Sequence, residues 1–121
     1  MVFSVNTPIQ VALSEYMKKP EHFTGLGKFY QHKRDEFLSF IKGSSLKPLP
    51  CYGSYFQLLS YENISKQGDT TMAEELTIRH KVASIPVSVF YKDRTDNHLL
   101  RFCFAKKDET LEKAGEILRK L

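Results

Sequence analysis

The sequence predicts an α/β domain, an α+β sandwich in which a small mixed or antiparallel sheet carries helices on one face. Three observations support this fold class. Helix-like and strand-like segments are interspersed along the chain, two strand-like segments are joined by a short turn, and the predicted helices carry apolar stripes. The chain has 121 residues, which is enough for one domain with its own hydrophobic core.

The first helix is expected to begin at Thr7 and Pro8, because threonine is a favoured N-cap and proline is favoured at the first helical position. We expect Pro20 to stop this helix, and Gly25 and Gly27 to mark a connector. The chain is therefore expected to divide into an N-terminal helix and connector, residues 1–27, and a second unit, residues 28–121. The apolar stripe of the first helix comprises Ile9, Ala12, Leu13, Tyr16 and Met17.

A second helix is expected over residues 28–41, and Gly43 lies just beyond its end. Residues 44–54 ("SSLKPLPCYGS") are interrupted by prolines and predict an extended approach to a strand. Residues 54–61 ("SYFQLLSY") are rich in strand formers and predict the first strand. We expect Tyr55 and Phe56 to pack in the core.

The third helix is expected over residues 70–81, with Asp69 as its N-cap and Met72, Ala73 and Leu76 facing inward. Residues 82–91 ("VASIPVSVFY") predict a short strand interrupted by Pro86, and residues 92–98 predict a turn. The last strand is expected over residues 99–105. Asp108 then caps a final helix whose apolar side comprises Leu111, Ala114, Ile117, Leu118 and Leu121.

Arg101 stands in the middle of the last, otherwise apolar strand. Alternation along the strand places the bulky Leu100, Phe102 and Phe104 on one face, which suits a core covered by helices. On the other face the neighbours of Arg101 are small, so its guanidinium has room to bind a carboxylate through two parallel hydrogen bonds. A structural ion pair, or an arginine on a solvated face of the sheet, is the alternative.

Three segments carry a resemblance to a known family: "GSYFQLLSYENIS", "MAEELTIRHKVASIPVSVFY" and "NHLLRFCFAKKDETLEKAGEILRKL". They resemble the C-terminal part of class I, fold-type I aminotransferases that use pyridoxal phosphate, nearest to the methionine and kynurenine (glutamine/aromatic) branch. "FSVNTPIQVALSEYM" and "FYQHKRDEFLSFI" resemble the same family, so the resemblance covers essentially the whole chain. It implies the small C-terminal domain of a pyridoxal-phosphate-dependent transferase.

The resemblance implies roles for five residues. Arg101 matches the arginine that binds the α-carboxylate of the amino acid and of the 2-oxo acid, the two substrates of the reaction. A segment near the substrate entrance is matched by Ile85, Pro86, Ser88 and Phe90, which implies contact with the substrate side chain. An edge strand with a proline break is the alternative for that segment. The amino donor would be methionine, glutamine or an aromatic amino acid.

The resemblance also implies that parts of the enzyme lie elsewhere. The family needs a lysine that forms a Schiff base with pyridoxal phosphate, an aspartate for the pyridine nitrogen and phosphate-binding groups, all in a large domain upstream of the matched region. Ser14 and Lys18 have the spacing of the family's Ser-x-x-x-Lys pattern but stand in the first predicted helix, so the match is weak. We therefore expect a C-terminal fragment with no catalytic residue, no bound cofactor and no activity by itself. The surface that it leaves uncovered would favour self-association, and the intact enzyme is expected to be a homodimer.

Composition restricts the other functions. The net charge of +4 permits an anionic partner without requiring one. Two distant cysteines fit a reducing compartment, the cytoplasm, better than a disulfide scaffold, and four scattered histidines lack metal-ligand spacing. There is no apolar run long enough for a membrane span and no recognisable signal peptide. The rival functions are a small RNA-binding module, with Phe102 and Phe104 as stacking aromatics beside basic residues, and a ligand-sensing or dimerisation module.

Overall fold

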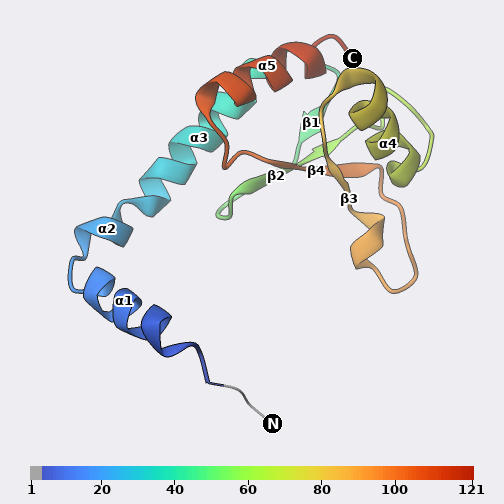
Figure 1. The fold of residues 1–121 in the computed structure, drawn as a ribbon. Helices are drawn as coiled ribbons and strands as arrows, with labels where there is room; N and C mark the ends of the chain where they lie inside the picture. Colours follow the sequence, from blue (N-terminus) through green and yellow to red (C-terminus); the bar gives the residue numbers. More distant parts are fainter. Residues whose placement is uncertain (1–3) are drawn as a thin grey trace.

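The computed structural model describes residues 4–121; residues 1–3, which belong to the expected N-terminal unit, lie outside the described residues. The elements follow the predicted order with three additions, the short helix α2, the two-residue strand β1 and the 3-10 helix η1 (Figure 1). The strand expected over residues 82–91 is wrong for most of its length, because only Ile85–Pro86 pair with the sheet and Ser88–Phe90 form η1. The elements are α1 (Thr7–Met17), α2 (Glu21–Thr24), α3 (Leu26–Phe40), β1 (Lys47–Pro48), β2 (Phe56–Ser60), α4 (Asp69–His80), β3 (Ile85–Pro86), η1 (Ser88–Phe90), β4 (Leu99–Cys103) and α5 (Asp108–Leu118).

The four strands form one sheet in the order β1-β2-β4-β3, and every neighbouring pair is antiparallel. The predicted fold class, a small sheet with helices, is thereby confirmed in its antiparallel form. The central pair, β2 and β4, has Phe56 opposite Cys103 and Leu58 opposite Arg101. On the other side of β4, Ile85 of β3 also stands opposite Arg101. Arg101 therefore occupies the middle of the sheet, with a strand on each side.

Three helices, α3, α4 and α5, contribute to the core on one face of the sheet (Figure 1). Leu100, Phe102 and Phe104 point into this core, as alternation along the last strand predicts. Burial of these side chains removes apolar surface from water, which is the main force that holds helices on the sheet. The buried core comprises Phe37, Ile41, Leu46, Leu59, Tyr61, Met72, Ala73, Leu76, Val82, Leu100, Phe102, Phe104, Leu111 and Leu118.

The N-terminal helices lie apart from the sheet (Figure 1). No residue of α1 or α2 is buried, so the apolar stripe of the first helix is exposed. The expected connector at Gly25 and Gly27 is wrong: α2 occupies Glu21–Thr24, and α3 begins at Leu26 and includes Gly27. Gly25 has φ −80° and ψ −12°, which is a helical conformation. Glycine permits a turn without requiring one, so two glycines alone did not specify a loop.

Three expected helix caps are wrong by one position. Thr7, Asp69 and Asp108 are each the first helical residue, and the N-caps are Asn6, Gly68 and Lys107. Asp69 and Asp108 instead bond to groups far along the chain, Ser88 and Lys33 respectively. Hydrogen bonds of a carboxylate are stronger than neutral ones, and a carboxylate in the first turn still interacts favourably with the helix dipole. The sequence therefore located these helix starts but not the partners of the two acids.

Candidate functional site

Arg101 projects from the face of the sheet opposite the core. Since Leu58 and Ile85 stand opposite it on the two neighbouring strands, their side chains share that face. Leu58 and Arg101 are half-buried, and Ile85 is exposed. Arg101 thus has aliphatic neighbours at its base and is half-buried as a whole, as is common for a long cationic side chain.

Two aromatic rings contact the guanidinium of Arg101. The Cζ atom lies 4.8 Å from the ring centroid of Phe56 and 4.9 Å from that of Phe90. Phe56 begins β2 and stands opposite Cys103, two residues from Arg101 on the same face, whereas Phe90 ends η1. A cation over an aromatic ring is attracted by the negative face of the ring, typically by about 0.5–1 kcal/mol where the site is exposed. The two rings therefore restrict the position of the guanidinium.

Within residues 4–121, Arg101 has neither an ion pair with an acidic side chain nor a hydrogen bond from its guanidinium. The alternative of a structural ion pair is therefore wrong for the described part of the chain. Arg34 provides a contrast, because its guanidinium donates to Asp35 and to the backbone oxygen of Cys51. Arg101 thus combines a restricted position with N–H donors that no described residue uses, which suits a site for an anionic ligand.

Two of the other four predicted site residues lie beside Arg101. Ile85 stands opposite it and the ring of Phe90 contacts it. Pro86 stands opposite the buried Leu100, and Ser88 is itself buried. The backbone N–H of Ser88 donates to Asp69 Oδ2 and its hydroxyl donates to Asp69 Oδ1, both at 2.7 Å. The structure therefore brings Arg101, Ile85 and Phe90 together and separates Pro86 and Ser88 from them.

Phe56 is the site residue that sequence reasoning missed. Tyr55 and Phe56 were expected in the core, but Tyr55 is 54% exposed and Phe56 is half-buried on the face of Arg101. Alternation along β2 would have paired Phe56 with Leu58 and Ser60 on one face, leaving Gln57 and Leu59 for the core. Gln57 is indeed buried, and its side-chain amide donates to the backbone oxygens of Leu49 and Leu58.

The residues expected of an RNA-stacking surface lie inside the protein. Phe102 is 4% exposed and Phe104 is 1% exposed, and both belong to the core cluster. A base cannot stack on rings that are already packed against helices. The RNA-binding alternative is therefore wrong in the form that the sequence suggested.

Ser14 and Lys18 do not form a cofactor site. Neither residue is buried; Lys18 is the C-cap of α1 and its Nζ lies 2.6 Å from Oε1 of the exposed Glu15. A lysine that bonds to pyridoxal phosphate needs an enclosed site with phosphate and pyridine partners, and none surrounds Lys18. Within residues 4–121, no cluster of His, Cys, Asp or Glu is placed to hold a metal ion. No helix of the same residues is long and apolar enough to cross a membrane.

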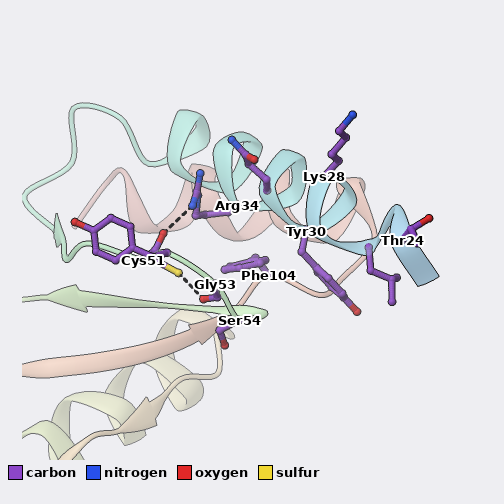
Figure 2. Close-up of a pocket in the computed structure, with 12 residues that line it drawn as sticks. Thr24, Lys28, Tyr30, Arg34, Cys51, Gly53, Ser54 and Phe104 are labelled. Carbon is purple, nitrogen blue, oxygen red and sulfur yellow. Dashed lines mark hydrogen bonds between the residues drawn. The ribbon is translucent and has the colours of Figure 1, made fainter. Parts of the chain in front are cut away.

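A cavity of about 510 Å³ lies between α3 and the loop at residues 51–54 (Figure 2). Arg34 borders it, but Nη1 of Arg34 donates to the backbone oxygen of Cys51 at 2.7 Å, and its other nitrogens donate to Asp35. The hydrogen bond to Asp35 raises the pKa of Arg34. The Cys51 thiol donates to the backbone oxygen of Gly53. The guanidinium and the thiol that border this cavity therefore already have partners, unlike the guanidinium of Arg101.

Comparison with known proteins relates the chain to transaminases, although no family model matches it. The chain is 45% identical to the methionine aminotransferase of Escherichia coli, over 100% of this chain and 32% of the relative. It is 33% identical to a kynurenine–oxoglutarate transaminase of Dictyostelium discoideum, over 98% of this chain and 32% of the relative. The sequence resemblance to methionine and kynurenine aminotransferases is thereby confirmed.

Solved structures give the same relation. An Escherichia coli protein with a methionine aminotransferase function superposes with a TM-score of 0.92 at 45% identity, over 99% of this chain and 32% of that protein. An N-succinyldiaminopimelate aminotransferase of Mycobacterium tuberculosis superposes with a TM-score of 0.77 at 28% identity, over 91% of this chain and 29% of that protein. The chain thus spans about a third of the length of the relatives that it matches.

Proposed function

We propose that this chain, which is homologous along its length to about a third of the methionine and kynurenine aminotransferases, is the domain of such an enzyme that binds the substrate carboxylate. The enzyme would move an amino group between methionine, glutamine or an aromatic amino acid and a 2-oxo acid. The observation that supports this proposal most directly is the Arg101 guanidinium, which two rings restrict and no acid of residues 4–121 neutralises.

The chemistry of Arg101 fits a reaction with two different substrates at one site. An amino acid and a 2-oxo acid differ at the reacting carbon, but both carry a carboxylate next to it. One guanidinium with a fixed fork of donors can bind that carboxylate in each half of the reaction through two parallel hydrogen bonds. Fixing the carboxylate also fixes the neighbouring carbon. The substrate therefore has less freedom left to lose in the chemical step, which lowers the entropic part of the barrier.

The apolar residues around Arg101 would strengthen this contact. Leu58, Ile85, Phe56 and Phe90 keep water away from part of the guanidinium, and a lower local dielectric increases its attraction to a carboxylate. Ile85 and Phe90 are exposed, so they can also contact the side chain of an apolar substrate. Apolar contacts of this kind suit methionine and aromatic donors better than charged ones.

The described residues do not fit pyridoxal phosphate, so we place its binding in the part of the enzyme that this chain does not span. Bound there, the cofactor would carry the amino group from one substrate to the other. On this proposal the chain alone is inactive and the intact enzyme is a cytoplasmic homodimer. Residues 1–27 would connect the large domain to the small domain, residues 28–121. The exposed apolar side chains of α1 support such a connection, because a helix of this kind is usually covered in an assembled protein.

The test is the substitution of Arg101 in the full-length enzyme. Arg101→Ala should weaken the apparent affinity for the amino acid and for the 2-oxo acid alike, by about 2–5 kcal/mol, since the substrate carboxylate loses its charged partner. Arg101→Lys should restore only part of the loss, because an ammonium cannot form the two parallel bonds. Arg119→Ala, which changes an exposed arginine at the C-cap of α5, is the matched control. Unchanged affinity for both substrates in Arg101→Ala would refute the proposal.

A further inference from the structure

We propose that Asp69 is a positioning residue of the site: through Ser88 it fixes the η1 turn and so holds Phe90 against the guanidinium of Arg101. This inference rests on the proposed carboxylate site and adds to it a residue on a different element, at the start of α4. Asp69 was expected to be a helix cap, and neither the family resemblance nor the arrangement around Arg101 assigned it a part in the site.

Asp69 has a buried carboxylate and four hydrogen bonds, one of them a long bond of 3.4 Å from the Thr70 hydroxyl to Oδ1. It is 2% exposed, and its two oxygens accept the N–H and the hydroxyl of Ser88, each at 2.7 Å. Its own N–H donates to Oδ2 of Asp96 at 2.8 Å, and Asp96 Oδ1 accepts the N–H of His98 just before β4. A buried carboxylate is costly unless it is well hydrogen-bonded, so these short bonds tie α4 firmly to the turn at Ser88.

Backbone hydrogen bonds of η1 connect the restrained Ser88 to Phe90. Ser88 begins η1 and Phe90 ends it, and the N–H of Phe90 bonds to the backbone oxygen of Val87 at 3.1 Å. The N–H of Tyr91 bonds to the backbone oxygen of Ser88, also at 3.1 Å. These two bonds fix the backbone of Phe90 relative to Ser88. Where Ser88 is held, the Cα atom of Phe90 is held as well.

Burial does not hold the ring of Phe90 in place. Phe90 is 59% exposed, and its centroid is 4.9 Å from Cζ of Arg101. A ring that is mostly in water relies on its backbone for its position, because few packed neighbours restrain it. Ser88, by contrast, is 6% exposed and anchored to Asp69. The anchored residue and the exposed ring are two positions apart on one turn, so the anchor determines where the ring lies.

Asp69→Ala should therefore loosen η1, withdraw Phe90 from Arg101 and leave the guanidinium less restricted. The experiment measures, in the full-length enzyme, the dissociation constants of the best donor among methionine, glutamine and phenylalanine, of its 2-oxo acid, and of the amine that lacks the donor's carboxyl group. We expect Asp69→Ala to weaken both carboxylate ligands by a similar factor, about three- to fivefold, which is the most that loss of the Phe90 ring contact can give, and to leave the amine unchanged. Equal weakening of all three ligands, or of none, would overturn the inference.

A double-mutant cycle tests whether Asp69 acts through Phe90. In a Phe90→Leu background, Asp69→Ala should weaken the carboxylate ligands by less than about twofold. An undiminished loss in that background would mean that Asp69 acts by another route, and the inference would fail. Asp69→Asn should give an intermediate loss. Its amide oxygen can still accept the N–H of Ser88, but its amide nitrogen cannot accept the hydrogen bond from the Ser88 hydroxyl.

Two further variants separate this result from other causes. Met72→Ala removes a buried side chain of the same helix that has no part in the contacts of Ser88, so it should lower thermal stability without changing the affinity for either carboxylate ligand. Should Met72→Ala weaken them as much as Asp69→Ala, the effect belongs to general stability and the inference is wrong. Arg101→Ala distinguishes the two proposals: if it weakens the carboxylate ligands while Asp69→Ala does not, only the inference about Asp69 fails.

Discussion

Gly115 of α5 lies so close to Phe40 of α3 that a Cβ atom added at Gly115 would stand 2.3 Å from the Cβ of Phe40. The backbone of Phe40 is nearly as close, with its carbonyl carbon at 3.3 Å and its Cα at 3.4 Å from the same position. A backbone cannot move aside as a flexible side chain can. The two helices therefore approach each other at a point that only glycine permits.

Gly115→Ala should lower the free energy of unfolding even though alanine is the better helix former. The gain in helix propensity is about 1 kcal/mol. Overpacking against Phe40 should cost about 3 kcal/mol, so we expect a net loss of about 2 kcal/mol, measured by urea denaturation. Glu116→Ala, the next residue and an exposed one, should change stability little. A Gly115→Ala protein more stable than wild type would contradict this prediction, because α3 and α5 would then have moved apart at little cost.

Phe56→Leu should weaken the affinity of the full-length enzyme for both the amino acid and the 2-oxo acid. The substitution keeps an apolar side chain but removes a ring whose centroid lies 4.8 Å from Cζ of Arg101. The expected loss is about 0.5–1 kcal/mol, or roughly two- to fivefold, measured by ligand titration. Tyr91→Leu removes an exposed ring from the end of η1 and should have no such effect. An equal effect of both substitutions would contradict the role given to Phe56.

Asp108→Asn should remove a stabilising contact that depends on pH. Asp108 pairs with Lys33, which lowers the pKa of Asp108 below its usual range. The folded state therefore favours the ionised acid, so this contribution is present at neutral pH and is lost as pH falls through the lowered pKa. Wild type should exceed Asp108→Asn in urea midpoint at about pH 7, and the difference should vanish near pH 2. A difference that persists at acid pH would exclude the ion pair as its cause.

Tyr61→Phe should have the opposite pH dependence. Burial, followed by the charges of Asp96 and Asp69, raises the pKa of Tyr61 well above its usual range. The folded state thus keeps the proton more tightly than the unfolded chain, so stability is lost as pH rises above about 10. Near neutral pH, Tyr61→Phe should cost about 1 kcal/mol, because the hydroxyl donates to the backbone oxygen of Gln67. Urea midpoints of the two proteins should converge in alkali; midpoints that stay equally far apart would refute this account.

The 121-residue chain produced alone should self-associate through α1. This helix has no buried residue, and Ile9 and Leu13, one turn apart, are 59% and 52% exposed. A second copy of the chain can cover such a stripe with its own, because two apolar helix faces are self-complementary. Ile9→Lys with Leu13→Lys should shift the mass measured by light scattering toward the monomer. Gln10→Lys, a neighbouring exposed position, should not, and a monomeric wild type would contradict the prediction.

The sequence predicted the fold well because its patterns are local. Alternation along residues 99–105 and the stripe of the final helix specified which side chains enter the core, and Leu100, Phe104 and Leu118 are buried as expected. What failed depended on partners far along the chain. Asp69 and Asp108 looked like caps because their contacts with Ser88 and Lys33 cannot be seen in a local window. The close approach of Gly115 to Phe40 was likewise invisible.

The site was predicted in part for the same reason. Arg101 was identified from the alternation of one strand together with the family resemblance. Phe56 was missed because its place beside Arg101 follows from the register of β2 on β4, and two strands separated by an intervening helix do not reveal their register. Ser88 was included because it belongs to the matched segment, although its side chain points into the protein toward Asp69. A resemblance can identify a segment, whereas the direction of each side chain depends on the backbone.

The pairing of β2 with β4 has a consequence for synthesis in the cell. The centre of the sheet cannot form until Cys103 has been synthesised to pair with Phe56, and α3 packs on α5, which is synthesised well after it. Contacts between such distant segments form slowly and only after a large loop has closed. A nascent chain whose synthesis stops before Leu118 would expose the apolar faces of its helices to chaperones and proteases. Truncations near this end of the chain should therefore be removed by quality control rather than accumulate.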